Sequence, residues 1–105
     1  MVYKFCFFVP DSHLDQVKDA VFATGAGKIG CYDRCAWQVK GTGQFRPLAG
    51  NNAYVGVTDQ LQCIEEYKVE MICRAEYLSQ AIEALKGAHP YETPAYEYWQ
   101  VGGSC

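Results

Sequence analysis

The sequence predicts an α+β sandwich in which one antiparallel sheet is covered on one face by two helices. Two observations carry this prediction: two stretches repeat apolar residues at helical spacing, and four others read as strands. A third is their order along the chain, strand-helix-strand-strand-helix-strand. That βαββαβ order is typical of ferredoxin-like folds. At 105 residues the chain is expected to form a single domain, residues 1–105, with its own apolar core.

The first strand is expected over Val2–Val9, where both odd and even positions are apolar. A strand that is apolar on both faces is covered on both, so it should lie in the centre of the sheet. Pro10–Ser12 ends this strand and opens the first helix. The helix carries an apolar stripe of Leu14, Val17 and Val21.

The second strand is expected over Gly30–Lys40, with Cys35, Trp37 and Val39 on its buried face. The glycine-rich segment Gly41–Pro47 follows. It is consistent with a bulged hairpin. It is also consistent with an anion-binding loop, in which Gly41, Thr42 and Gly43 present bare backbone N–H groups. Leu48–Asp59 is the longest expected loop, and long loops on compact domains are often functional.

The third strand is expected over Gln62–Arg74, the second helix over Glu76–Lys86 and the last strand over Thr93–Val101. In a ferredoxin-like sheet the first and third strands are central. Two helices cover one face only, so the other face needs a partner. Its aromatic residues, with Tyr96 and Tyr98 among them, predict an interface between copies of the chain.

Composition excludes several classes of function. The net charge of −3 and the scattered basic residues argue against nucleic-acid binding. No apolar run is long enough to cross a membrane, and the start of the chain shows no secretion leader. The six cysteines fit a reduced, cytoplasmic protein, with most of them filling the core. Cys31, in a glycine-flanked loop near Lys28 and Arg34, is the only plausible candidate nucleophile.

The candidate site centres on His89, Tyr91 and Glu92, in a short turn stiffened by two prolines. His89 and Glu92 could act as an acid–base pair or as two ligands of a divalent metal ion, with neighbouring subunits completing the coordination. Arg46 is the best single anion contact. The alternative is structural: His89 caps the second helix, Glu92 pairs with Arg46 or Lys28, and the tyrosines pack between subunits.

Three spaced motifs carry a family resemblance, namely Gly25–Asp33, Gly41–Pro47 and His89–Glu92. Together they resemble the small domain inserted in many Nif-three-like proteins, which also occurs alone in YqfO-type proteins. The resemblance implies a CutA/PII-like fold whose subunits typically assemble into trimers. The main lobes of that family carry a dinuclear metal site, and this chain, whose only histidines are His13 and His89, is not expected to carry one. Cyclohydrolase or metal-dependent hydrolase activity is therefore not expected to transfer.

The chain departs from that family pattern at a few positions. Lys28 and Cys31 stand where a histidine and an asparagine are common, and Ala53-Tyr54 stands where Pro-Phe is common. These changes put any shared ligand of that corner in question.

Three functional hypotheses remain open from the sequence. The first is a regulatory homo-oligomer, expected to be a trimer, that binds a small molecule or a metal ion near Gly41–Gly43, Arg46 and His89–Glu92. The second is a small hydrolase that acts through His89 and Glu92. The third is a protein–protein interaction module that uses the open aromatic face.

Overall fold

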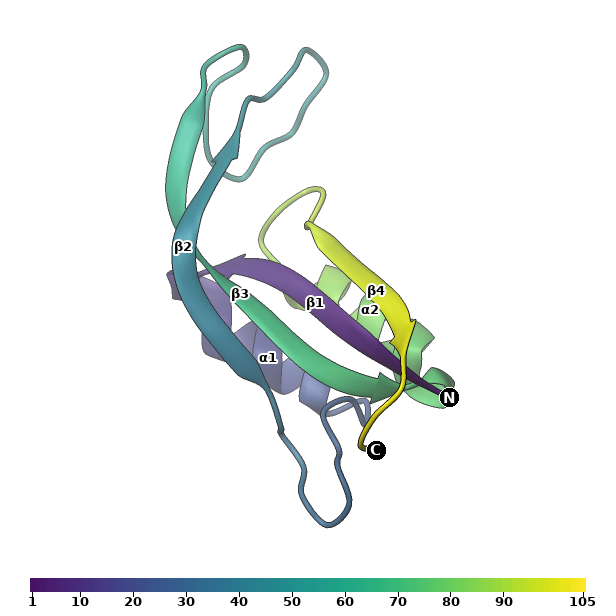
Figure 1. Ribbon diagram of the computed structural model, residues 1–105. Coiled ribbons are helices and arrows are strands. Elements are labelled where there is room, and N and C mark those ends of the chain that lie inside the picture. Colours follow the sequence, from purple (N-terminus) through teal and green to yellow (C-terminus); the bar gives the residue numbers. More distant parts are fainter.

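The computed structural model describes all residues, 1–105, and shows a four-stranded antiparallel sheet with both α-helices on one face (Figure 1). The strand order is β2-β3-β1-β4, so β1 and β3 are central, as predicted. No helix is long and apolar enough to cross a membrane. In chain order, and with a 3₁₀ turn before α1, the elements are β1 (Val2–Pro10), α1 (Leu14–Phe22), β2 (Trp37–Phe45), β3 (Gln62–Arg74), α2 (Ala75–Ala88) and β4 (Tyr96–Val101).

The core lies between the sheet and the helices. Alternate residues of β1 and β3 point toward the helices, because side chains alternate between the faces of a strand. The apolar stripes of both helices meet them, each at helical spacing. Full burial of each such side chain contributes about 1.5–3 kcal/mol. The buried cluster includes Phe5, Phe7, Val9, Val69 and Met71 from the strands and Leu14, Val17, Val21, Ala81 and Leu85 from the helices.

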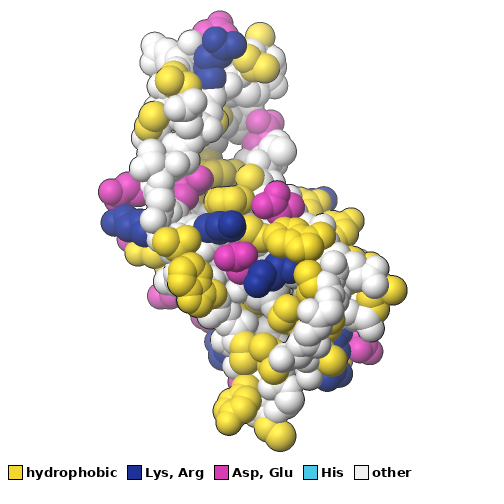
Figure 2. Space-filling view, viewed as in Figure 1, with side chains coloured by type: hydrophobic (Ala, Val, Ile, Leu, Met, Phe, Trp, Pro, Cys, Tyr) yellow, Lys and Arg dark blue, Asp and Glu magenta, His cyan; other side chains and the backbone are white.

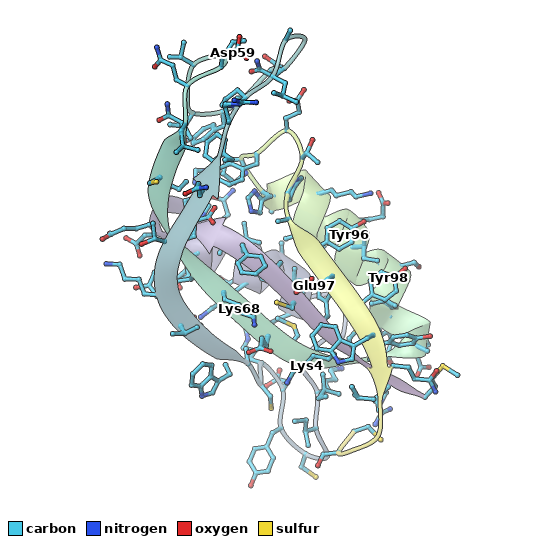
Figure 3. The ribbon with its side chains drawn as sticks, turned by 45° about the horizontal axis from the view of Figure 1, so that its top comes forward. Lys4, Asp59, Lys68, Tyr96, Glu97 and Tyr98 are labelled. Atoms are coloured by element: carbon cyan, nitrogen blue, oxygen red, sulfur yellow. The ribbon has the colours of Figure 1, made fainter.

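The opposite face of the sheet carries no helix, and Figure 2 shows it as apolar patches with basic and acidic side chains between them. Cross-strand pairing defines this face: Cys6 lies opposite Glu70 and Glu97, and Lys4 lies opposite Ile72 and Trp99. Figure 3 shows Lys4, Lys68 and Glu97 on this face, each from a different strand. The open face is therefore a mixed apolar and charged surface.

The prediction that Tyr96 and Tyr98 lie on the open face is wrong. Tyr96 pairs with Phe7 and Tyr98 pairs with Phe5, and both phenylalanines belong to the core on the helix side. Directly paired residues share a face, so the two tyrosines lie on the helix side as well (Figure 3). The exposed large aromatic residues of the open face are instead Trp37, which is 65% exposed, and Trp99, which is 45% exposed.

The predicted start of the second strand is also wrong, because β2 begins at Trp37 and not at Gly30. Gly30 and Arg34 have left-handed backbone conformations, with φ of 57° and 55°, and these cannot continue a strand. Nor does β2 have a buried face. It is an edge strand with no fully buried residue, and Val39 is 45% exposed.

The glycine-rich segment lies in β2 and not in a hairpin turn, since β2 runs on through Gly41-Thr42-Gly43 to Phe45. Its last residues pair with the start of β3, from Thr42 opposite Glu65 to Phe45 opposite Gln62. β1 ends its pairing with β3 at Glu66. Beyond that point β2 and β3 continue alone as a two-stranded arm (residues 42–45 and 62–65).

The arm carries the long loop of residues 46–61, with Asp59 at its far end (Figure 3). It lengthens the molecule to 46 × 24 × 23 Å. In Figure 1 the arm rises beside the turn that joins α2 to β4, residues 89–95. That turn is the segment from which the sequence predicts a site.

Candidate ligand site

A cavity of about 260 Å³ lies between the arm, its loop and the turn of residues 89–95. Three separate parts of the chain build its wall, so it forms only when the long loop and the turn come together. Half of the lining residues are hydrophobic, and none is Lys, Arg or His. Aromatic walls are supplied by Phe45, Tyr54 and Tyr91, and carboxylates by Glu66 and Glu92.

His89 fixes the turn to the sheet. Its backbone N–H donates to the Leu85 carbonyl at 2.9 Å and so completes the end of α2. The imidazole is buried, and its Nε2 lies 2.6 Å from the carbonyl oxygen of Phe8. The backbone N–H of Tyr91 donates to the Nδ1 at 3.1 Å. An imidazole with one donating and one accepting nitrogen is neutral.

Burial lowers the pKa of His89 from its ordinary value of 6.5, against the opposing effect of the hydrogen bond to Phe8 and the nearby Glu66 charge. The two ring nitrogens of His89, Nε2 and Nδ1, both form hydrogen bonds with backbone groups. Neither is free to ligate a metal ion or to take a proton from a substrate. The residues present do not fit the predicted metal site.

Glu92 does not pair with His89, Arg46 or Lys28. Its carboxylate accepts a hydrogen bond from the backbone N–H of Asn52 at 3.0 Å and so ties the long loop to the turn. Within the single chain, no three His, Cys, Asp or Glu side chains are close enough together to hold a metal ion. The two residues of the predicted acid–base pair therefore act separately. His89 holds the turn to β1, and Glu92 holds the long loop to the turn.

Tyr91 forms the floor of the aromatic part of the cavity. Its ring lies 4.7 Å from that of His89, 6.2 Å from that of Tyr54 and 6.5 Å from that of Phe45, measured between centroids. Its hydroxyl is shielded from solvent and has no hydrogen-bond partner.

Burial raises the pKa of the Tyr91 hydroxyl, and the neighbouring Glu66 carboxylate raises it further. The two groups are therefore close, although they do not reach hydrogen-bonding geometry. A buried hydroxyl without a partner costs about 1–3 kcal/mol. A ligand that bonded to it would recover part of that cost.

The glycines of β2 make room for Glu66. A Cβ at Gly43 would overlap the Glu66 carboxylate, whereas a Cβ at Gly41 would meet open space. Gly43 thus allows a half-buried acidic side chain to lie flat across the strand. A shallow hollow on the open face, next to the cavity, is lined by Gly41, Thr42, Gly43 and Glu66 among others.

The Glu66 carboxylate beside Gly43 argues against the prediction that Gly41–Gly43 binds an anion. Arg46, the expected anion contact, is exposed and does not line the cavity. Of the predicted site residues, Tyr91 and Glu92 line the cavity, His89 holds it in place, and the glycines lie beside its carboxylate.

Sequence reasoning missed Glu66, Tyr54 and Phe45 as cavity residues. The period-two pattern of β3 places Glu66 on the face opposite the core, but no pattern shows that a glycine lies across from it. Tyr54 belongs to a loop, whose path has no periodic signal. The one sequence signal for this part of the cavity wall is that Ala53-Tyr54 differs from the family pattern.

Solved structures of other proteins show the same fold. CutA from Archaeoglobus fulgidus, titled a periplasmic divalent cation tolerance protein, superposes with a TM-score of 0.69 at 13% identity and covers 96% of this chain and 84% of its own. The divalent cation tolerance protein of Thermus thermophilus gives 0.69 at 15% identity, covering 98% and 86%. The chain therefore has the CutA-like, ferredoxin-like fold. The expected fold class is confirmed.

Proteins of higher sequence identity align with this chain over a segment of their length. A Bacillus cereus protein related to NIF3 superposes with a TM-score of 0.84 at 35% identity, covering 98% of this chain and 26% of its own. Two proteins named GTP cyclohydrolase 1 type 2 homolog align at 41% identity (Halalkalibacterium halodurans, 95% of this chain and 27% of that one) and 37% (Mycobacterium tuberculosis, 93% and 26%). No family model matches.

The resemblance to Nif-three-like proteins is thus confirmed: the chain is homologous to a segment of them. It spans about a quarter of the length of the curated relatives that it matches.

Proposed function

We propose that this chain is a regulatory ligand-binding domain that acts as a homo-oligomer and takes a small molecule in the cavity between the arm and the turn of residues 89–95. The observation that carries the proposal is the buried, unpartnered hydroxyl of Tyr91 beside aromatic walls. Concave sites with apolar walls and a few placed polar groups are typical of small-molecule binding.

The geometry favours binding over catalysis. A general base needs a nitrogen or oxygen within reach of the substrate proton, and both nitrogens of His89 are bonded to backbone groups. Cys6 and Cys73 are buried, and burial raises their thiol pKa values, that of Cys73 to about 11. Such thiols are poor nucleophiles at neutral pH. The hydrolase hypothesis names His89 and Glu92, and both side chains are instead held by hydrogen bonds to backbone groups.

We propose a homotrimer as the assembly and the cytoplasm as the compartment. The open face supports an interface because it exposes Trp37 and Trp99 among charged side chains, and aromatic residues are enriched in interfaces. The family resemblance supports the trimer, and six unpaired cysteines fit a reducing compartment. Native mass spectrometry tests the assembly: a trimer that Trp37→Glu dissociates is expected, and a wild-type monomer would contradict it.

A second candidate function is protein interaction through the arm. Its loop exposes a group of large apolar side chains, which is typical of a recognition surface. They are Leu48, Tyr54, Val55, Val57 and Leu61, each between 39% and 61% exposed.

A fragment screen followed by protein NMR separates the two candidates. Binding at the cavity should shift the backbone resonances of Tyr54 and Tyr91. Ala53→Trp, which fills the lining, should abolish these shifts. Asn52→Trp is the matched control, because the Asn52 side chain does not line the cavity. Fragments that bind both variants equally, or that never shift Tyr91, would contradict the proposal and favour the interaction role.

A further inference from the structure

We propose that the cavity takes a small organic cation, an amine on an aromatic or alkyl body, with its ammonium group between Glu66 and the Tyr91 hydroxyl. This inference rests on the proposed function and names the class of its ligand. It reverses the sign of charge that the sequence suggests, since Gly41–Gly43 and Arg46 together predict an anion.

The charge of the cavity is one-sided. Glu66 and Glu92 are the only ionisable acids among its lining residues, and no basic residue lines it. The two ion pairs of the chain, Arg34–Asp19 and Lys40–Glu65, involve neither of them. An anionic ligand would lie beside two carboxylates that form no ion pair, whereas a cation would neutralise them.

Glu66 is the more important of the two carboxylates. It is half-buried, and Gly43 gives it the space to lie there. A carboxylate removed from water without a partner is unfavourable unless a cation or several hydrogen-bond donors satisfy it. The nearby imidazole of His89 cannot do so, because its one N–H points to Phe8. Lys68 lines the adjacent hollow together with Glu66 but forms no ion pair with it. The free carboxylate therefore favours a ligand that brings the positive charge.

The remaining wall suits the rest of such a molecule. The Tyr91 ring lies within 6.5 Å of the rings of Phe45 and Tyr54, and aromatic faces attract a cation within about 6 Å. The unpartnered Tyr91 hydroxyl can accept an ammonium N–H. Pro47, Val55 and Ala53 complete an apolar surface for the carbon skeleton.

A bare metal ion is the competing occupant, and the wall argues against it. Hard divalent cations in proteins take six or more oxygen ligands, or retain several waters. Here two carboxylates and a few neutral polar side chains share the lining with six hydrophobic residues, and those six offer contact to carbon but no coordination.

Calorimetric titration with three probes of similar shape tests the proposal: phenethylamine (cationic), 2-phenylethanol (neutral) and phenylacetate (anionic). The amine should bind the wild-type protein most tightly. Glu66→Gln should weaken amine binding by about tenfold or more, the loss expected for one charge-assisted hydrogen bond, and should leave 2-phenylethanol unchanged. Glu65→Gln is the matched control, because that adjacent glutamate is exposed and bonded to Lys40. It should leave all three affinities unchanged.

Each other outcome overturns the inference. If 2-phenylethanol or phenylacetate binds as tightly as the amine and shifts the Tyr91 resonances, the cavity is a ligand site but not a cation site, and the proposed function survives. Calcium or zinc chloride that shifts Tyr91 without any amine response would assign the carboxylates to a metal. If no probe in the fragment screen or the titration reaches Tyr91, both the inference and the proposed function fail.

Discussion

The two ends of β3 lie in different surroundings, although they belong to one strand. The C-terminal end, Val69–Cys73, lies under the helices, with Val69, Met71 and Cys73 buried. The N-terminal end, Gln62–Glu66, pairs with β2 in the arm, and none of its residues is fully buried. The first end holds the fold together and the second helps to shape a cavity. Stability and recognition can therefore be altered separately in this chain.

The largest expected effect comes from truncating one phenylalanine at each end. Phe7→Ala removes a fully buried core ring and should lower the free energy of unfolding by about 3–5 kcal/mol. Phe45→Ala removes a half-buried ring of the cavity and should cost about 1 kcal/mol, since less apolar area is lost. Urea denaturation measures both. Equal losses would show that the arm belongs to the core after all.

The second effect concerns the clamp between the turn and the sheet. His89→Ala leaves the Phe8 carbonyl and the Tyr91 N–H without their partner and should destabilise the protein by about 1–3 kcal/mol. His13→Ala is the control, since the His13 side chain hydrogen-bonds only to the neighbouring Ser12 and otherwise makes an edge contact with the Tyr54 ring. A His89 variant as stable as wild type that no longer binds any fragment would restore a direct ligand role for the imidazole.

The third effect is a dependence of stability on pH. His89 is buried as the neutral form, so its pKa is lower in the folded protein than its ordinary 6.5 in the unfolded chain. Below about pH 6.5 the unfolded chain takes up a proton that the folded protein resists. Stability should therefore fall as the pH drops through that range, until it reaches the folded pKa.

The facing ionisable groups, Glu66 and His13, act on this titration in opposite directions. His89→Gln should flatten the stability curve between pH 7 and 5, as followed by urea denaturation at each pH. An unchanged slope in that variant would assign the acid sensitivity to other groups.

The smallest expected change in stability accompanies a specific change in binding. Gly43→Ala should shift the folding free energy by less than about 1 kcal/mol, because the flexible Glu66 side chain can move aside. It should weaken phenethylamine binding, since the carboxylate leaves its place. Gly41→Ala meets open space and should change neither. Thermal unfolding measures the stability of the two variants, and calorimetry measures their affinity for phenethylamine. The comparison shows whether Gly43 matters because it leaves room for Glu66 or because any glycine in β2 has the same effect.

The core end of the molecule is the part that the sequence predicts well. Alternation in β1 and β3 and helical spacing in α1 and α2 are direct consequences of burial, so Phe7, Val69 and Leu85 could be assigned to the core without coordinates. The element order then selects the topology, because few sheets accommodate two such helices on one face.

The cavity end could not be predicted in the same way. Whether Tyr96 faces the helices depends on its register with Phe7, and a shift of one residue would reverse its face. The role of Gly43 depends on Glu66 lying across the strand pair, a relation between residues distant in sequence. The sequence does indicate the turn of residues 89–95, but assigns to His89 a chemical role that its two backbone hydrogen bonds exclude.

A crystal structure of the protein soaked with phenethylamine tests the central claim most directly. The account predicts the ligand between the rings of Phe45, Tyr54 and Tyr91, with its nitrogen within hydrogen-bonding distance of Glu66 and the Tyr91 hydroxyl. The His89 imidazole should keep its bonds to Phe8 and Tyr91. A ligand found elsewhere on the chain, or a His89 ring turned out to contact it, would contradict the account.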